Sequence, residues 1–233
     1  MNKMKKKLKK IYNRLNRISC PVKIDDITLE PRCRGYGYKM GTPIDRYYIE
    51  KFLEEKKDVI KGDVLEVSED TYTKKYGGNC KSHILSFDNS VKADNVVVGD
   101  LTDADSLPEN RFDCFICTQT LNFIFDVESA IKNIYHILKE NGIALVTVAS
   151  VSQISKYDHE RWGDYWRFTD QGIMTLFSKY FKEENIEVAS YGNYFSAISL
   201  FSGIVIEDIK EKSVLDVKDD EFPVVICLKV MKN

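Results

Sequence analysis

Residues 112–148 read FDCFICTQTLNFIFDVESAIKNIYHILKENGIALVTV, and the hydrophobic pattern changes twice along this stretch. Residues 112–117 and 143–148 are short apolar runs, which are typical of strands buried on both faces of a sheet. Between them, residues 127–139 carry apolar side chains at three- and four-residue steps and predict an amphipathic helix. We expect Asn141 and Gly142 to end that helix in a left-handed cap. The stretch therefore predicts two parallel strands joined by a helix.

The same alternation extends outward in both directions. Thr42 followed by Pro43 is a helix-start signal and predicts a helix over residues 44–55. We expect a short helix at residues 171–179 and further strands at residues 63–67, 82–87, 95–98, 186–191 and 224–230. Continuously apolar strands that alternate with helices indicate an α/β fold, with a mostly parallel central sheet and helices on both of its faces.

The N-terminal region differs from the rest of the chain in charge. The formal net charge is −2, but residues 1–19 hold eight basic side chains and no acidic one, so the remainder carries −10. Apolar residues recur at helical steps among these bases and predict a basic amphipathic helix. Two interpretations stay open: the helix lies on an anionic membrane surface or a partner, or it packs on its own domain. Residues 20–42 are rich in glycine and proline, so we expect an N-terminal extension over 1–42 and an α/β domain over 43–233.

Several functional classes find no support in the sequence. The nearly balanced charge gives no case for nucleic-acid binding. No apolar stretch approaches the roughly 20 residues of a membrane span, and the N-terminus lacks the apolar core of a secretory signal. Cys114 and Cys117 lie three residues apart on a predicted strand and so face opposite sides, which disfavours a shared metal ion or a redox pair. We therefore expect buried free thiols, a cytoplasmic protein and no metal site.

Polar residues follow the predicted strands at the edge where ligands bind. In open parallel sheets, ligands lie outside the carboxyl ends of the strands. A carboxylate that ends an apolar strand, such as Glu66, is costly unless it is paired, so it has either a ligand or a structural partner. An aspartate that follows a glycine, such as Asp100, can also simply form a turn. The candidate ligand residues at the strand ends are Glu66, Ser68, Asp88, Asp100, Leu101, Gln119 and Thr120.

Over residues 43–230 this series resembles the class I S-adenosylmethionine (SAM)-dependent methyltransferases. The matching features are an acid ending the first strand, an acid after the second, a Gly-Asp segment with Leu-Pro downstream, a Phe-Asp strand and a Leu-Lys-x-x-Gly turn: Glu66, Asp88, Gly99-Asp100 with Leu107-Pro108, Phe112-Asp113 and Leu138–Gly142. More narrowly, GTPIDRYYIEKFL (residues 41–53), LEVSEDTYTKKYGG (65–78) and WGDYWRFT (162–169) resemble a bacterial methyltransferase-like group associated with surface-glycan or sugar-modifying genes. The resemblance implies a Rossmann-like fold, SAM as cofactor, and methyl transfer to a small-molecule or glycan-type acceptor.

The resemblance also implies roles for individual residues in cofactor binding. Glu66 would hold the methionine ammonium or an adjacent water, Asp88 the ribose hydroxyls, and Asp100 the adenine amino group. Tyr47, on the helix before the first strand, would cover the cofactor, with core packing as an equal alternative. The remaining cofactor contacts would come from Ser68 and Leu101, and from Gln119 and Thr120 beside the methyl group.

The segment after the fifth strand carries the predicted acceptor site. Exposed aromatic rings can stack on a sugar, and a guanidinium can pair with a phosphate or a carboxylate. His159 or Asp164 would accept the proton that the acceptor loses. A packed lid held by a salt bridge is the alternative interpretation. The predicted acceptor contacts are Trp162, Tyr165, Trp166 and Arg167.

The turn after the first strand departs from the family pattern. Ser68-Glu69-Asp70-Thr71-Tyr72 stands where Gly-x-Gly-x-Gly is usual, and the glycines of that turn permit close backbone approach to a ligand. Gly77-Gly78 lies later in the chain and can supply flexibility instead. The departure keeps a second hypothesis open, namely a binding or partner subunit that has the methyltransferase fold without catalysis. A NAD-dependent nucleotide-sugar enzyme is disfavoured, because Glu69 and Asp70 would repel a pyrophosphate.

Overall fold

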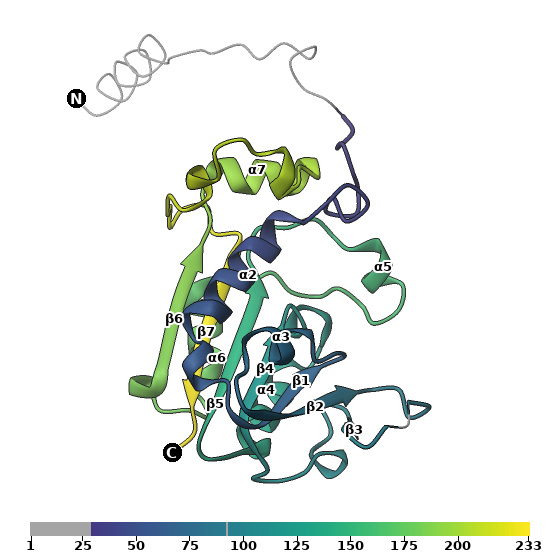
Figure 1. The fold of residues 1–233 in the computed structure, drawn as a ribbon, viewed down its shortest axis with the longest axis vertical. Helices are drawn as coiled ribbons and strands as arrows, with labels where there is room; N and C mark the ends of the chain where they lie inside the picture. Colours follow the sequence, from purple (N-terminus) through teal and green to yellow (C-terminus); the bar gives the residue numbers. More distant parts are fainter. Residues whose placement is uncertain (1–28, 92) are drawn as a thin grey trace, which may run out of the picture. The chain divides into compact units, whose positions relative to one another are not determined.

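Seven strands form a central sheet in the order β3-β2-β1-β4-β5-β7-β6 (Figure 1). Strands β1 to β5 pair in parallel, and β7 lies antiparallel between β5 and β6, so the predicted mostly parallel sheet is confirmed. This computed structural model describes residues 29–91 and 93–233, and the helix predicted at residues 1–19 lies outside them. The strands are β1 (Gly62–Val67), β2 (Cys80–Ser86), β3 (Val96–Val98), β4 (Phe112–Thr118), β5 (Leu138–Ala149), β6 (Ile186–Tyr191) and β7 (Val225–Met231).

Helices cover both faces of the sheet, as the sequence predicts. One face packs against α2 (Ile44–Glu55), α3 (Thr71–Tyr76) and α7 (Tyr194–Ser202), and the other against α4 (Val127–Ile137) and α6 (Asp170–Phe177). A short helix, α5 (Lys156–His159), follows β5 without joining either layer (Figure 1). Single 3-10 turns lie at Lys57–Val59, Ala104–Ser106, Leu121–Phe123, Glu183–Asn185, Ile206–Asp208 and Lys212–Leu215.

Strand β4 separates the two apolar layers, because its successive side chains point to opposite faces. Cys114 and Ile116 belong to the core beneath α2, whereas Phe115 and Cys117 belong to the core beneath α4. Cys114 and Cys117 therefore face opposite sides, as predicted, and both are free thiols. Burial raises the pKa of both, that of Cys117 to about 12, so neither is a reactive thiolate near neutral pH.

The end of α4 differs from the sequence prediction. The helix ends at Ile137, and the following residues already belong to β5, where Leu138 pairs with Phe112. Asn141 has the expected left-handed backbone, with φ of 63°, but it lies within β5 at the point where the register to β4 shifts. A Cβ on Gly142 would lie 2.9 Å from the Phe112 carbonyl oxygen. The Asn-Gly pair therefore makes an irregularity in a long strand instead of a helix cap.

Part of the predicted N-terminal connector packs on the α/β domain. Residues 32–233 form one compact unit. The Arg32 amide donates to the Ser202 carbonyl over 2.8 Å, at the end of α7. Thr42 donates from its amide and its hydroxyl to the Glu207 carboxylate, over 2.9 and 2.7 Å. These contacts hold the chain before α2 against the carboxyl edge of the sheet. Among the described residues, none of the helices is long and apolar enough to cross a membrane.

Candidate active site

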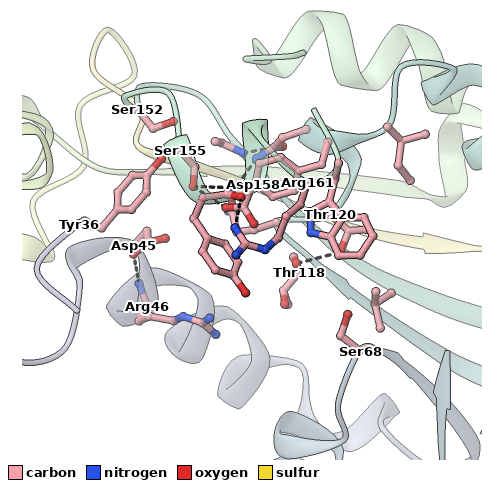
Figure 2. A pocket seen from close by; sticks show the side chains of 18 of the residues that line it. Tyr36, Asp45, Arg46, Ser68, Thr118, Thr120, Ser152, Ser155, Asp158 and Arg161 are labelled. Carbon is pink, nitrogen blue, oxygen red and sulfur yellow. Dashed lines mark hydrogen bonds between the residues drawn. The ribbon is translucent and has the colours of Figure 1, made fainter. Parts of the chain in front are cut away.

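A cleft of about 1070 Å³ opens at the carboxyl ends of β1 to β5. Residues that follow each of these strands line it, together with residues 34–39, the first turn of α2 and the segment around α5. Figure 2 shows side chains of three such segments turned toward one another: Arg46 on α2, Thr118 at the end of β4 and Arg161 after α5. The volume lies at the upper end of the roughly 300–1,000 Å³ of most small-molecule sites, so the cleft is large enough for a small-molecule ligand.

Glu66 ends β1 as a buried carboxylate with three partners on α3. It accepts hydrogen bonds from the amides of Tyr72 and Thr73, over 3.1 and 2.7 Å, and from the Thr73 hydroxyl over 2.8 Å. Burial raises the pKa of Glu66, and these three donors counteract that shift by stabilising the charged form. Glu66 thus fixes the first turn of α3 and borders the cleft at the same time. It therefore has the structural partner that the sequence left open.

The turn between β1 and α3 adopts a glycine-like backbone without a glycine. Ser68 has a φ of 68°, in the left-handed region, and its amide donates to the Leu85 carbonyl over 2.9 Å. Such a conformation costs a residue with a Cβ about 1–2 kcal/mol. The two acids of the turn have different surroundings. Glu69 lines the cleft, whereas Asp70 pairs with Lys74 and accepts a hydrogen bond from the Ser82 hydroxyl.

Asp100 and Leu101 line the cleft after β3. Asp100 Oδ1 accepts hydrogen bonds from the amide and the hydroxyl of Thr102, each over 2.8 Å, so the predicted turn is present. The Leu101 carbonyl accepts from the Asn133 side chain on α4 over 2.8 Å, which fixes the turn to the layer below. Gly99 is required there, because a Cβ would lie 2.8 Å from the Leu107 side chain and 2.9 Å from the Ser106 carbonyl oxygen.

Gln119 and Thr120 lie at the end of β4, and both line the cleft. Gln119 has a φ of 49°, and its amide donates to the Thr147 carbonyl of β5 over 2.8 Å. The Asn122 side chain donates to Gln119 Oε1 over 3.1 Å. The Thr120 hydroxyl donates to the Thr118 carbonyl over 3.1 Å (Figure 2). These bonds hold the polar groups of this strand end in fixed positions.

Several predicted site residues lie outside the cleft lining. Asp88 is exposed and accepts from the Ser90 amide over 2.8 Å in a local turn. The Tyr47 hydroxyl donates to Asp216 over 2.8 Å, because Tyr47 occupies a different side of α2 from Asp45. His159 is exposed on α5. Tyr165 and Trp166 pack around Phe125, with ring centroids 5.4 and 6.2 Å away. The residues absent from the cleft lining are thus Asp88, Tyr47, His159, Asp164, Tyr165 and Trp166.

Asp164 and Arg167 form the salt bridge of the packed-lid interpretation. Arg167 donates to both carboxylate oxygens over 2.5 and 2.9 Å, and the Ser155 amide donates to Asp164 over 2.9 Å. Burial of Asp164 acts to raise its pKa, but the bonds from Arg167 and Ser155 outweigh this and hold the pKa below its ordinary value. Arg167 also donates to the carbonyls of Ser152 and Gln153. The pair thus ties together the segment between β5 and α6.

Trp162 and Arg167 are the predicted acceptor residues that do line the cleft. The Trp162 ring meets Phe87, which follows β2, in an edge-to-face contact with centroids 6.2 Å apart. Both rings are more than half exposed, so they form an aromatic rim at the mouth of the cleft.

The sequence interpretation missed the residues that α2 brings into the cleft. Asp45 and Arg46 lie in its first turn, and both line the cleft (Figure 2). Arg46 donates to the hydroxyls of Tyr38, over 3.1 and 3.0 Å, and of Tyr72. Burial raises the pKa of Asp45. Burial also raises the pKa of Tyr36, to about 12, and its hydroxyl donates to the Gln153 carbonyl over 2.9 Å. Asp45 and Arg46 could have been found from the sequence, because they directly follow the predicted helix start before the first strand.

The chain is similar to known methyltransferases in sequence and in fold. Residues 56–146 match the model of a methyltransferase domain family. No functionally curated protein matches the chain. A SAM-dependent methyltransferase from Archaeoglobus fulgidus shares the fold, with 13% identity, a TM-score of 0.52, and 80% of this chain and 94% of that chain covered. The N-methyltransferase NodS from Bradyrhizobium japonicum, solved with S-adenosylhomocysteine (SAH), also shares the fold. Its identity is 12% and its TM-score 0.51, with 86% of this chain and 93% of that chain covered.

A third structure shows that this fold is not restricted to methyl transfer. The [4+2]-cyclase SpnF has 14% identity and a TM-score of 0.53, with 88% of both chains covered. The acceptor therefore cannot be taken from fold similarity. The match, which runs from before β1 into β5, and the strand order are nevertheless consistent with each other. Residues 56–146 therefore match a methyltransferase domain, and the whole sheet has the Rossmann-like fold of the SAM-dependent methyltransferases.

Proposed function

We propose that the cleft binds SAM at the ends of β1, β3 and β4, and that the chain transfers its methyl group to an oxygen or nitrogen of a small-molecule or glycan-type acceptor. The observation that carries the proposal is a separation of charge within the cleft. Of the described residues that line it, those at and after the ends of β1, β2 and β3 include Glu66, Glu69 and Asp100 but no lysine or arginine. An acidic end suits a cofactor that bears a sulfonium and an ammonium group.

The fit of the cofactor is supported by the backbone of the cleft. The left-handed Ser68 leaves the turn after β1 in the conformation that a glycine would give it. Gly99 keeps the third strand end free of a side chain. In this proposal Asp100 accepts from the adenine amino group, and Leu101 packs on the ring. Gln119 and Thr120 flank the methyl group.

Arg46 is the residue that we assign to the methionine carboxylate. Its guanidinium is held by the hydroxyls of Tyr38 and Tyr72, and it has no carboxylate partner among the described residues. Tyr72 lies on α3, whose first turn Glu66 fixes. Arg46 therefore lies beside the turn that would face the methionine part. A partly buried guanidinium whose direct partners are two neutral hydroxyls favours an anionic ligand group.

The chain itself must orient the acceptor and take up its proton. When SAM is bound, it supplies an activated methyl group, so the reaction needs little further covalent help. Asp45 is the best-supported proton acceptor, because it lines the cleft and its burial raises its pKa, which makes the carboxylate a stronger base. Asp164 is a weaker base, since its partners hold its pKa low. The aromatic rim of Phe87 and Trp162 supports a sugar ring as part of the acceptor.

Calorimetric titration of the full chain with SAM, and separately with SAH, tests the proposal. We expect micromolar binding of both, because the cleft keeps the backbone and the charges that the cofactor needs. No binding of either ligand to a protein that melts cooperatively would overturn the proposal. That outcome would instead favour a binding or partner subunit without catalysis.

A further inference from the structure

A basic half of the cleft complements the acidic strand ends. The basic residues that line it come from residues 34–46 and 156–167, and they are Arg34, Lys39, Arg46, Lys156, Arg161 and Arg167. Two acids share this half, namely Asp45 and Asp158. Asp45 accepts a hydrogen bond from the Arg46 amide, and Asp158 accepts one from the Ser155 hydroxyl, so these two acids are already engaged while six bases line the same half. Positive charge therefore predominates where the acceptor would enter.

Arg161 is the guanidinium in this half that is most available to a ligand. It stacks over the Tyr157 ring with its central carbon 3.5 Å from the ring centroid, and one nitrogen donates to the Tyr157 carbonyl over 2.8 Å. No carboxylate among the described residues pairs with it. An arginine has five N–H donors, so the ring and one carbonyl orient the group and leave most of its edge unused.

The sequence analysis predicted that Arg167 binds the acceptor, but Arg167 is less available to a ligand than Arg161. Its guanidinium is bound to both oxygens of Asp164 and to backbone carbonyls, so its charge and its donors are already satisfied. The same pair holds the segment from which Arg161 projects, because the Ser155 amide at the start of α5 also donates to Asp164. Asp164 and Arg167 thus build the support, and Arg161 presents the charge.

We propose that the acceptor is an anion, and that Arg161 binds its carboxylate or phosphate group. A planar guanidinium that is already stacked on a ring loses little freedom on binding and offers two parallel N–H groups to two oxygens. Trp162 follows Arg161 and belongs to the aromatic rim, which places a ring-stacking surface next to the cation. An acidic sugar, either a uronate or a sugar phosphate, satisfies both features. This inference rests on the proposed function only for the identification of the bound molecule as the methyl acceptor.

Titration of the full chain with glucuronate, glucose 6-phosphate and glucose tests the inference, in the presence and absence of SAH. We expect at least one charged sugar to bind roughly tenfold or more tightly than glucose. Arg161→Gln should remove that advantage, and Arg161→Lys should retain part of it, because a lysine keeps the charge but not the paired donors. The preferred sugar distinguishes a carboxylate from a phosphate.

Arg111→Gln is the matched control, because Arg111 also lies over an aromatic ring, that of Phe112, with its central carbon 5.4 Å away, but outside the cleft. This variant should bind the charged sugar as the unchanged protein does. Equal binding of charged and neutral sugars, or of none, would overturn the inference, and so would an Arg161→Gln variant with unchanged affinity. SAH titration of the same variants separates this failure from that of the proposed function, since Arg161→Gln should keep its SAH affinity.

Discussion

At the scale of single residues, two aspartates from the sequence prediction have different environments. Asp100 lines the cleft after β3, whereas Asp88 lies outside the lining in an exposed turn. We expect Asp100→Ala to weaken SAH binding roughly tenfold or more, because it removes the carboxylate that we propose accepts from the adenine amino group. Asp88→Ala is the matched control and should leave the affinity unchanged. Calorimetry on both variants checks this, and equal effects of the two substitutions would contradict the assignment.

Ser68 shows how a site can keep a backbone conformation after its usual residue has changed. Its φ of 68° is strained for serine but not for glycine. We expect Ser68→Gly to raise the free energy of unfolding by about 1 kcal/mol and to keep SAH binding. Ser86→Gly, at the end of β2, should lower stability instead, because it weakens the strand end and removes the hydroxyl that bonds the Asp88 backbone. Urea unfolding of both variants measures this, and a destabilised Ser68→Gly protein would show that the serine side chain is needed.

Residues at the strand ends could be predicted, because parallel strands bring their carboxyl ends to one edge. Glu66, Asp100 and Gln119 line the cleft for that reason. Arg46 and Arg161 could not be found in the same way. Their availability depends on what surrounds them: Arg46 on tyrosines 8 and 26 residues away, and Arg161 on the capture of Arg167 by Asp164. The local sequence does not show which arginine is bound by a distant or neighbouring side chain and which one stays available.

At the scale of elements, segments with a clear apolar pattern were predicted correctly, whereas some short helices were missed. The helix over residues 44–55 and the strand over 186–191 have the predicted bounds. Helix α3 was missed because it is six residues long and is held by Glu66, which precedes it on another element. Helix α7 was missed because six of the nine residues of its sequence, YFSAISLFS, are aromatic residues or serines, which have modest helix propensity. Its capping box at Asn193 and Ser196 is the local signal that marks its start.

The segment between β5 and α6 depends on the buried Asp164–Arg167 pair. We expect Asp164→Asn to lower the free energy of unfolding at pH 7 by about 2 kcal/mol, because a charged acceptor of three hydrogen bonds is lost. Since folding lowers the pKa of Asp164, its contribution is present above the ordinary aspartate pKa and is lost as the pH falls through the folded value.

The difference in stability between the two proteins should therefore shrink below pH 4 or so, near the ordinary aspartate pKa. Urea unfolding between pH 7 and pH 3 measures it. Asp94→Asn, at an exposed loop position, is the control and should have no effect at any of these pH values. A difference that stays constant as the pH falls would show that the Asp164 charge does not stabilise the segment.

At the scale of the whole molecule, charge is separated twice. Within the cleft, acids gather at the strand ends and bases on the segments before α2 and after β5. Along the chain, residues 1–19 carry eight basic side chains, whereas the remainder carries −10. The first separation suits a cationic cofactor and an anionic acceptor. The separation along the chain means that residues 1–19 attract anionic partners, whereas the acidic remainder repels them.

The predicted basic helix lies outside the described residues, and we propose that it binds an anionic membrane surface. Each lysine or arginine near such a surface contributes about 1 kcal/mol, while the acidic remainder is repelled, so any attraction must come from residues 1–19. We expect the full chain to sediment with phosphatidylserine-containing vesicles but not with phosphatidylcholine vesicles, and high salt should abolish sedimentation. Deletion of residues 1–19 should abolish it as well. If the deletion lowers the melting temperature and leaves sedimentation unchanged, the helix packs on its own domain instead.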